Sequence, residues 1–323
     1  MLSLARHALK GPLAAATVAS GLLFLGLLLP LLAGLIGAFI TLPLIGCSAA
    51  VVSLVLLRRG PGEALSAIVA VLLMVVVMGL LSRGGVTQLL AILLQFWLPA
   101  IVVAYALRQS VRLDIAVLVA AGVGLATLLV MHIAFGDTTA FWERAMGAHI
   151  DASVQLAEQQ AGEASTDPRF QAQVETLRSS LGVMARIATP GVAVMIMMTG
   201  LISVFLARSW QAQMFNPGGF QQEFHKLRLG KSVALGVLIV AGLSLLTDWV
   251  FLSDVVVVLL ATMMIQGLAV LHGIVKIRGM SGGWLTGTYL MMILPHTSAL
   301  VGALGIADNW LNIRQLSDDK KID

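Results

Sequence analysis

Long apolar runs, separated by short segments that carry most of the charges, follow one another along the chain. A helix needs about 20 apolar residues to cross the hydrocarbon core of a bilayer. This pattern predicts an all-α polytopic membrane protein, a bundle of about 8–9 transmembrane helices with one extramembrane helical hairpin. The predicted spans are 13–33, 36–57, 64–81, 86–107, 114–135, 183–207, 232–250, 255–275 and 283–305.

The first two spans are interrupted by Pro30, Gly34, Gly37 and Pro43. Such residues are tolerated in a bilayer where neighbouring groups satisfy the freed backbone, so the pair is either a tight hairpin or a broken helix. The N-terminal bases, apolar core and small residues are also typical of a signal peptide. Because apolar sequence continues to Leu57, we favour a first transmembrane helix instead.

Composition agrees with this class. Apolar residues make up 59% of the chain and charged residues 11%, and the mean hydropathy is +0.96, whereas soluble domains are about 45–50% apolar and about 25% charged. The composition therefore excludes a soluble protein and predicts that the chain lies in a lipid bilayer. The net charge of +4 comes from bases between spans, so they are topology signals and no nucleic-acid partner is expected. The single Cys47 cannot form an intrachain disulfide.

The distribution of bases predicts orientation. Cytoplasmic loops carry an excess of Lys and Arg, and this bias favours a cytoplasmic N-terminus in a bacterial inner membrane. Nine spans place the tail outside, whereas eight spans, or a re-entrant last segment around Pro295, place it inside. The tail itself combines Lys320 and Lys321 with Asp318, Asp319 and Asp323 and does not decide. The predicted inner bases are Arg6, Lys10, Arg58, Arg59, Arg108, Arg112, Arg208, Lys226, Arg228, Lys231, Lys276 and Arg278, and the outer ones are Arg83, Arg144, Arg169, Arg178 and Arg186.

Residues 136–182 are the one sizeable extramembrane segment. Two apolar stripes at helical spacing, with STDP (165–168) starting the second, predict an extracytoplasmic helical hairpin on the membrane surface or capping the bundle. It serves either as a packing cap or as a substrate lid or partner surface. The stripes are Trp142, Met146, Ile150, Val154 and Ala157, then Phe170, Val174, Leu177, Leu181 and Met184.

The inner loop 208–231 contains a turn at 216–219 followed by a short amphipathic piece. One interpretation is an interfacial helix that touches anionic headgroups. The alternative is a docking site for a cytoplasmic partner protein, formed by Phe220, Phe224, Lys226 and Arg228.

No motif of a soluble enzyme is present in the sequence. It has no GxxxxGK[ST] for nucleotide hydrolysis, no HExxH and no cysteine pair for a metal. We therefore expect no enzyme activity, no catalytic residues, no cofactor and no metal. Small residues in AAATVAS (14–20), GVGLATL (122–128) and GALG (302–305) predict close helix contacts instead.

Polar residues within spans are costly to bury and serve as functional candidates by default. Asp248 and Asp254 are interpreted as a wet outer turn, and His132 and His272 as reaching water or a carbonyl. Gln95 and Gln266 are expected to bond between helices. His296, after Pro295, is expected to line a cavity in a kinked helix. No acid is clearly mid-membrane, which argues against a proton pump.

Two stretches carry a family resemblance: FLARSWQAQMF with FQQEFHKLRLGK, and the C-terminal GIADNWLNIR. Together they resemble the YybS-like family of predicted bacterial inner-membrane proteins, whose last span ends in a glycine, an acid, an aromatic and an arginine. Gly305, Asp308, Trp310 and Arg314 match this ending, whereas Asn312 stands where an acid is frequent. The family is distantly similar to the substrate-binding membrane subunits of energy-coupling-factor transporters. That similarity implies a small-molecule or lipid-linked ligand and an energy-supplying partner.

Two functional hypotheses follow. The first is a protein that binds or translocates a small or amphiphilic molecule with partner proteins and without its own ATPase. The second is a membrane scaffold for envelope assembly or division; an enzyme acting on a lipid carrier lacks a visible catalytic group. Because a helix end needs no acid, Asp308 predicts a polar or basic partner on another helix or at a helix N-terminus. Trp310 and Arg314 are four apart and are expected to share a helix face, which is also typical of an interfacial anchor. The candidate ligand-binding residues are His296, Asp308, Trp310, Arg314, Gln266 and His272.

Overall fold

The apolar runs fold into helices. The computed structural model describes residues 1–81, 85–162 and 166–314, and all regular structure in these ranges is helical, which confirms the predicted all-α polytopic class. Arg83 and the charged tail residues Asp318, Asp319, Lys320, Lys321 and Asp323 lie outside the described residues. The helices are α1 (Leu2–Ala8), α2 (Pro12–Arg58), α3 (Pro61–Leu81), α4 (Val86–Ser110), α5 (Leu113–Phe135), α6 (Thr138–Ala161), α7 (Pro168–Phe215), α8 (Gly219–His225), α9 (Lys231–Leu245), α10 (Val250–Ile277), α11 (Gly283–Met291) and α12 (Pro295–Leu311).

The predicted spans fall on apolar helices, except that 283–305 covers two helices, α11 and α12, instead of one. Among the described residues, six helical segments are long and apolar enough to cross a membrane, or seven if the bent pair α11–α12 counts as one. Two of the predicted spans are shorter apolar helices, Pro61–Val77 and Lys231–Leu245. The six long segments are Pro12–Gly37, Phe39–Arg58, Val86–Ser110, Leu113–Phe135, Pro168–Phe215 and Val250–Ile277.

The interrupted first pair of spans is a helical hairpin. Gly34 has φ 53° and ψ −129°, a backbone conformation that glycine adopts without the steric penalty of a Cβ. Two hydroxyls tie the arms together: Thr41 donates to the Gly26 carbonyl over 2.9 Å and Ser48 to the Ala19 carbonyl over 2.7 Å. The tight-hairpin interpretation is therefore correct.

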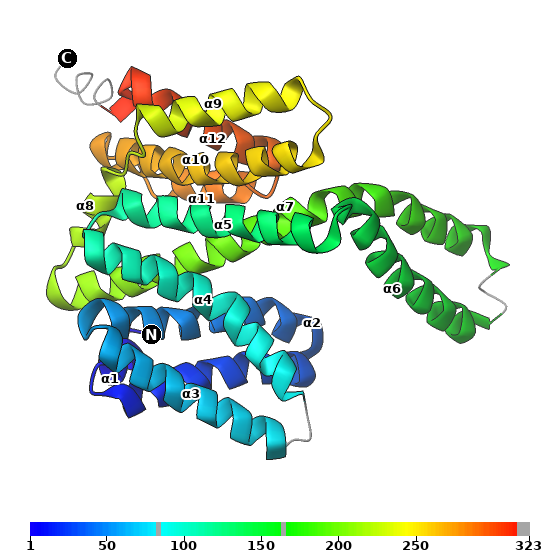
Figure 1. Cartoon of the computed structure of the whole chain (residues 1–323), viewed down its shortest axis with the longest axis horizontal. Coiled ribbons are helices and arrows are strands. Elements are labelled where there is room, and N and C mark those ends of the chain that lie inside the picture. The colour runs from blue at the N-terminus through cyan, green and yellow to red at the C-terminus, as the bar shows by residue number, and fades with distance from the viewer. Residues whose placement is uncertain (82–84, 163–165, 315–323) are drawn as a thin grey trace.

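Helix α7 lies at the centre of the bundle and packs against α2, α4, α5 and α10 (Figure 1). Its close approach to α4 depends on Gly200, where an added Cβ would lie 2.8 Å from Pro99. Gly124, from the predicted small-residue stretch of α5, lies against α7 and α10; Gly302 and Gly305 lie against the backbone of α10. These positions confirm the predicted close helix contacts at GVGLATL (122–128) and at GALG (302–305).

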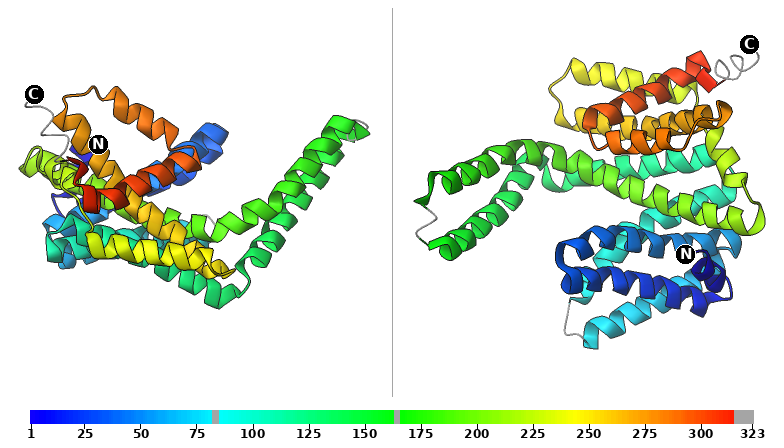
Figure 2. Two further views of the ribbon diagram at one scale, coloured as in Figure 1. Left: turned by 90° about the horizontal axis from the view of Figure 1, so that it is seen from above. Right: turned by 180° about the vertical axis from the view of Figure 1, so that it is seen from behind.

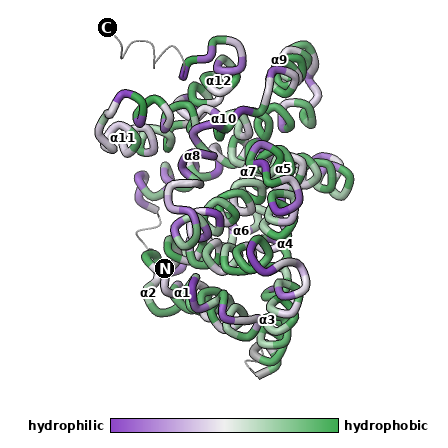
Figure 3. The backbone as a smooth tube through the Cα atoms, turned by 90° about the vertical axis from the view of Figure 1, so that its left-hand side faces the viewer, coloured by the Kyte–Doolittle hydropathy of each residue, from purple (hydrophilic) through white to green (hydrophobic). Residues whose placement is uncertain are grey.

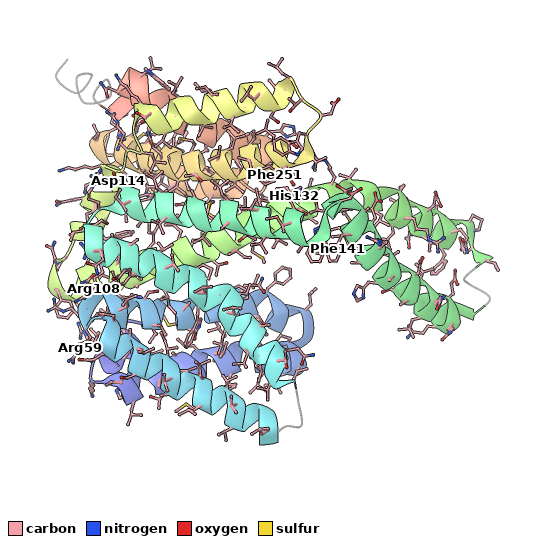
Figure 4. All side chains as sticks on the ribbon, viewed as in Figure 1. Arg59, Arg108, Asp114, His132, Phe141 and Phe251 are labelled. Carbon is pink, nitrogen blue, oxygen red and sulfur yellow. The ribbon has the colours of Figure 1, made fainter. Side chains whose placement is uncertain are left out.

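The two ends of the bundle differ in charge. At one end, here called the basic end, Arg59 donates to the Leu9 carbonyl and Arg108 to the carbonyls of Leu56 and Leu57 (Figure 4). Figure 3 views this end, where hydrophilic stretches gather on α8 and on the turns while the helices behind are mostly hydrophobic. The α6–α7 hairpin projects from the opposite end (Figure 1).

This hairpin is continuous with the bundle because α7 runs as one helix from the hairpin into the bundle. Asp167 caps its start by accepting from the Arg169 N–H over 2.7 Å; Ser165 of the predicted cap lies outside the described residues. The Trp142 indole donates to Thr189 over 2.9 Å at the base of the hairpin. The arms extend away from the helices rather than folding over them (Figure 2), so the hairpin does not cap the bundle.

The last apolar segment turns back on itself. α11 and α12 are bent by 117°. α11 starts after α10, and Arg314, just beyond α12, lies beside Gly273 near the end of α10. The pair therefore leaves and returns to the same end, the arrangement described above as a re-entrant last segment. That end is the basic end. Helix α8 packs against both α10 and α7, and the last residue of α7 is Phe215. The Arg58 guanidinium lies 4.1 Å from the centre of the Phe215 ring.

Candidate functional site at the basic end of the bundle

A loop without regular backbone pairing, residues 226–230 between α8 and α9, is held by side chains of two helices. Gln266 of α10 accepts from the Leu229 N–H over 2.8 Å. Asn309 of α12 accepts from the Gly230 N–H over 3.2 Å. Buried backbone donors need such partners, so these two amides determine where the loop lies.

Asp308 lies at the centre of this arrangement and is 0% exposed. Its Oδ2 accepts from Arg314 Nη2 at 2.6 Å and from Gln266 Nε2 at 3.3 Å, and Arg228 approaches it at 3.5 Å. Arg314 also donates to the carbonyls of His225 and Leu227, the latter over 3.0 Å. The predicted partners of Asp308 are confirmed. Gln266 forms a hydrogen bond between α10 and α12, as expected.

Arg314 reaches Asp308 because the chain reverses after α12. Asn312 adopts φ 47° and ψ 46°, a left-handed conformation that asparagine tolerates better than most residues. α12 therefore ends at Leu311, and Arg314 folds back onto the helix end. The expectation that Trp310 and Arg314 share a helix face is wrong for this reason: Trp310 is 43% exposed, whereas the Arg314 side chain is nearly buried.

Beside this cluster lies a basic cleft of about 540 Å³. It continues into a second hollow that shares His225 and Lys276 with it and extends to Gly282 and Leu285 at the start of α11. The basic cleft is lined by His225, Lys226, Arg228, Gly273, Lys276, Ile277 and Arg314, a set with no acidic residue.

The field of the basic cleft acts on His225 of α8. Burial lowers the pKa of His225 below its ordinary value of 6.5, and the His272, Lys276 and Arg314 charges lower it further. The unfolded chain therefore takes up this proton near pH 6.5, and the folded chain only at lower pH. Acidification through pH 6.5 should thus reduce the free energy of unfolding until the folded pKa is passed.

We expect this loss to be smaller in His225→Gln. Thermal unfolding measured on both sides of pH 6.5 in wild type and variant checks the prediction. An equal fall in both proteins would contradict it. The Arg314 contact is retained in the variant because it uses the His225 backbone carbonyl.

An apolar groove of about 700 Å³ lies between α10, α11 and α12. Gly283 and Trp284 line it, while Gly282 and Leu285 on the same turn of α11 line the hollow that joins the basic cleft. The groove and the basic cleft are therefore neighbours across the start of α11. The other residues along the groove are Leu271, Ser281, Gly287, Thr288, Met291, Thr297, Leu300, Val301 and Leu304.

The remaining sequence candidates are spread out. His296 is exposed at the start of α12, twelve residues or about 18 Å from Asp308 along the helix, so the two do not meet. His272 Nε2 lies 2.9 Å from the Tyr289 hydroxyl and does not bond a carbonyl. Gln95 is half-buried in α4.

The amphipathic piece 219–225 packs inward. Phe220 and Phe224 lie 5.6 and 5.7 Å from the ring of Phe205 on α7, ring centroid to ring centroid. Phe224 also meets the His272 ring edge-on at 5.4 Å. Lys226 and Arg228, proposed with them as a docking set, instead face the basic cleft.

A second buried ion cluster lies at the opposite end and was missed in the sequence. Asp254 is 2% exposed; its carboxylate lies 2.9 Å from His132 Nε2 and accepts from Arg186 over 3.1 Å. Arg186 also donates to Ser253 over 2.7 Å. The wet-turn interpretation of Asp254 and the water or carbonyl partner of His132 are thus wrong, while Asp248 is exposed as expected. The cluster joins α5, α7 and α10, and Figure 4 labels its member His132 near the point where the hairpin leaves the bundle.

Comparison with known proteins identifies a family for this chain. No curated protein and no solved structure matches the chain. The family model described as predicted membrane protein (DUF2232) matches residues 16–309, which is most of the sequence. The chain therefore belongs to the DUF2232 family of predicted membrane proteins.

Proposed function

We propose that this protein binds or translocates an amphiphilic molecule at the groove between α10, α11 and α12, together with partner proteins and without hydrolysing nucleotide itself. The observation that carries the proposal is the apolar groove next to a basic cleft. An amphiphile has this same division into an apolar chain and a polar head. The resemblance to the YybS-like family, and in outline to energy-coupling-factor binding subunits, supports the same reading.

The proposed setting is a bacterial inner membrane with the basic end in the cytoplasm. The excess of bases at that end supports this orientation under the positive-inside rule. The amphiphile would then enter the groove from the cytoplasmic side of the bilayer. The hairpin would extend on the extracytoplasmic side, where a partner protein has access to it.

The groove is tested by filling it. Gly287 lines the groove, and a Cβ added there meets nothing within 4 Å, so Gly287→Leu should fold and occupy the space. Gly122→Leu is a matched control, since Gly122 is an exposed helical glycine of α5 with equally open surroundings. Native mass spectrometry with a long-chain alkyl phosphate should count bound probe in wild type and Gly122→Leu, and much less in Gly287→Leu.

Equal occupancy in all three proteins would contradict the proposal. The scaffold hypothesis has one observation in its favour: the projecting hairpin leaves Leu156 and Leu177 exposed. Crosslinking from the hairpin to one stoichiometric partner, combined with no probe in the groove, would favour the scaffold over the binding protein.

A further inference from the structure

The basic cleft holds more positive charge than its own acids neutralise. Four bases line it. Among the described residues, the carboxylate that pairs with two of them is Asp308, which is fully buried behind their guanidinium groups. Lys226 and Lys276 have no ion pair within the described part of the chain. An anion placed in the cleft would therefore meet two unpaired ammonium groups as well as the field of Arg228 and Arg314.

The four bases are held to different degrees. Arg314 uses its donors on Asp308 and on two carbonyls, so it supplies mainly charge. Arg228 has only long contacts of 3.5 Å to Asp308 and keeps donors for a ligand. Each lysine ammonium offers three donors. The network around Asp308 thus positions the guanidinium groups before any ligand arrives.

A site in the bilayer with this groove and cleft must select its ligand by the headgroup. In a bilayer, lipid tails are as apolar as the groove, so filling the groove favours one chain over another only weakly. Discrimination must then come from the basic cleft. A zwitterionic headgroup brings its own cation, which four bases repel, whereas a phosphate brings several acceptor oxygens and a charge near −2, suited to charge-assisted hydrogen bonds.

We infer that the basic cleft binds the phosphate or pyrophosphate group of the amphiphile, with Lys226 and Lys276 as its direct ligands and Arg228 as a third donor. The inference deepens the proposed function and rests on it for the alkyl chain of the ligand. The phosphate chemistry is shared by a lipid headgroup and by a free phosphate, and the experiment separates the two.

The test measures binding of a long-chain alkyl phosphate and the alcohol of the same chain to the full-length protein in non-ionic detergent. The Lys226→Gln/Lys276→Gln double variant should bind the alkyl phosphate about a hundredfold more weakly, because each of the two lost charge-assisted hydrogen bonds contributes about tenfold. Lys10→Gln/Lys231→Gln removes the same charge from exposed positions at the same end, outside the basic cleft, and should bind as wild type does.

Several outcomes would overturn the inference. These are equal affinity for alkyl phosphate and alcohol, or an equal loss in both double variants, which would mean a diffuse field and not a site. Inorganic phosphate and pyrophosphate form the second arm. If they bind as tightly as the alkyl phosphate and depend on the two lysines, the ligand is a free phosphate. If the alkyl phosphate binds tighter and Gly287→Leu weakens it, the ligand is a lipid.

The two proposals fail separately. Lysine-dependent phosphate binding that ignores Gly287→Leu contradicts the amphiphile groove and leaves the phosphate site intact. Binding that is lost in Gly287→Leu but is the same with and without the two lysines contradicts the phosphate site alone. Thermal unfolding of each variant verifies that it folds, and none of these lysines has a structural bond to lose among the described residues.

Discussion

Asp308→Asn is expected to lower the stability of the folded protein by roughly 3 kcal/mol or more, because it leaves guanidinium charges without the buried carboxylate that compensates them. The carboxylate is inaccessible to water, and Arg314 donates to it over 2.6 Å. Asparagine keeps the size of the side chain and removes its charge, so packing is nearly constant. Thermal unfolding in detergent micelles, converted to free energy, measures the change.

Asp114→Asn is the matched control at the same end. Asp114 also pairs with an arginine, Arg112, but that guanidinium is exposed. The two residues lie two positions apart at the start of α5. Exposed pairs contribute little because water screens them, so the control should unfold almost as wild type does. The double variant Asp308→Asn/Arg314→Gln should recover part of the loss, since it removes both charges. Similar losses from Asp308→Asn and Asp114→Asn would refute a special role for Asp308.

Gly305→Ala is expected to separate α10 from α12 and to cost about 3 kcal/mol, at the upper end for overpacking. A Cβ at Gly305 would fall within 3.0 Å of the Met263 carbonyl and the Gly267 N–H, and backbone atoms cannot rotate away. Because α12 carries Asp308 and one wall of the groove, we also expect weaker binding of the alkyl phosphate probe. Unfolding and probe binding are measured on the same preparation.

The control for that substitution is Gly287→Ala in α11. Its Cβ would meet nothing within 4 Å, so the change should be neutral or slightly stabilising through helix propensity. If Gly305→Ala were equally neutral, the close contact between α10 and α12 would not exist as described. A loss of stability with unchanged probe binding would mean that the probe binds elsewhere than between these helices.

Much of the fold followed from local pattern. An apolar run long enough to cross a bilayer becomes a helix wherever it lies, since its backbone must be satisfied internally. The spans, the hairpin at Gly34 and the close contacts of Gly124, Gly302 and Gly305 were predictable for that reason. The need of Asp308 for a partner was predictable as well, because a charge at a helix end in a membrane is costly when left alone.

The candidate site was less predictable, because its members are distant in sequence. Arg228 precedes Asp308 by 80 residues, and the contact between α5 and α10 joins His132 to Asp254 over 122 residues. His296 and Asp308 were both candidate ligand-binding residues, but the length of α12 separates them in the structure.

By itself, the sequence determined the class, the approximate spans and the excess of bases at one end, because hydropathy and charge act locally along each helix. Only the tertiary structure decided which charges pair, where the last segment returns and which residues line the groove and the basic cleft. Two turns explain the return and the site: the 117° bend between α11 and α12, and the left-handed Asn312 that folds Arg314 back onto Asp308. Such reversals depend on the helices packed against them, so apolar periodicity carries no record of their direction.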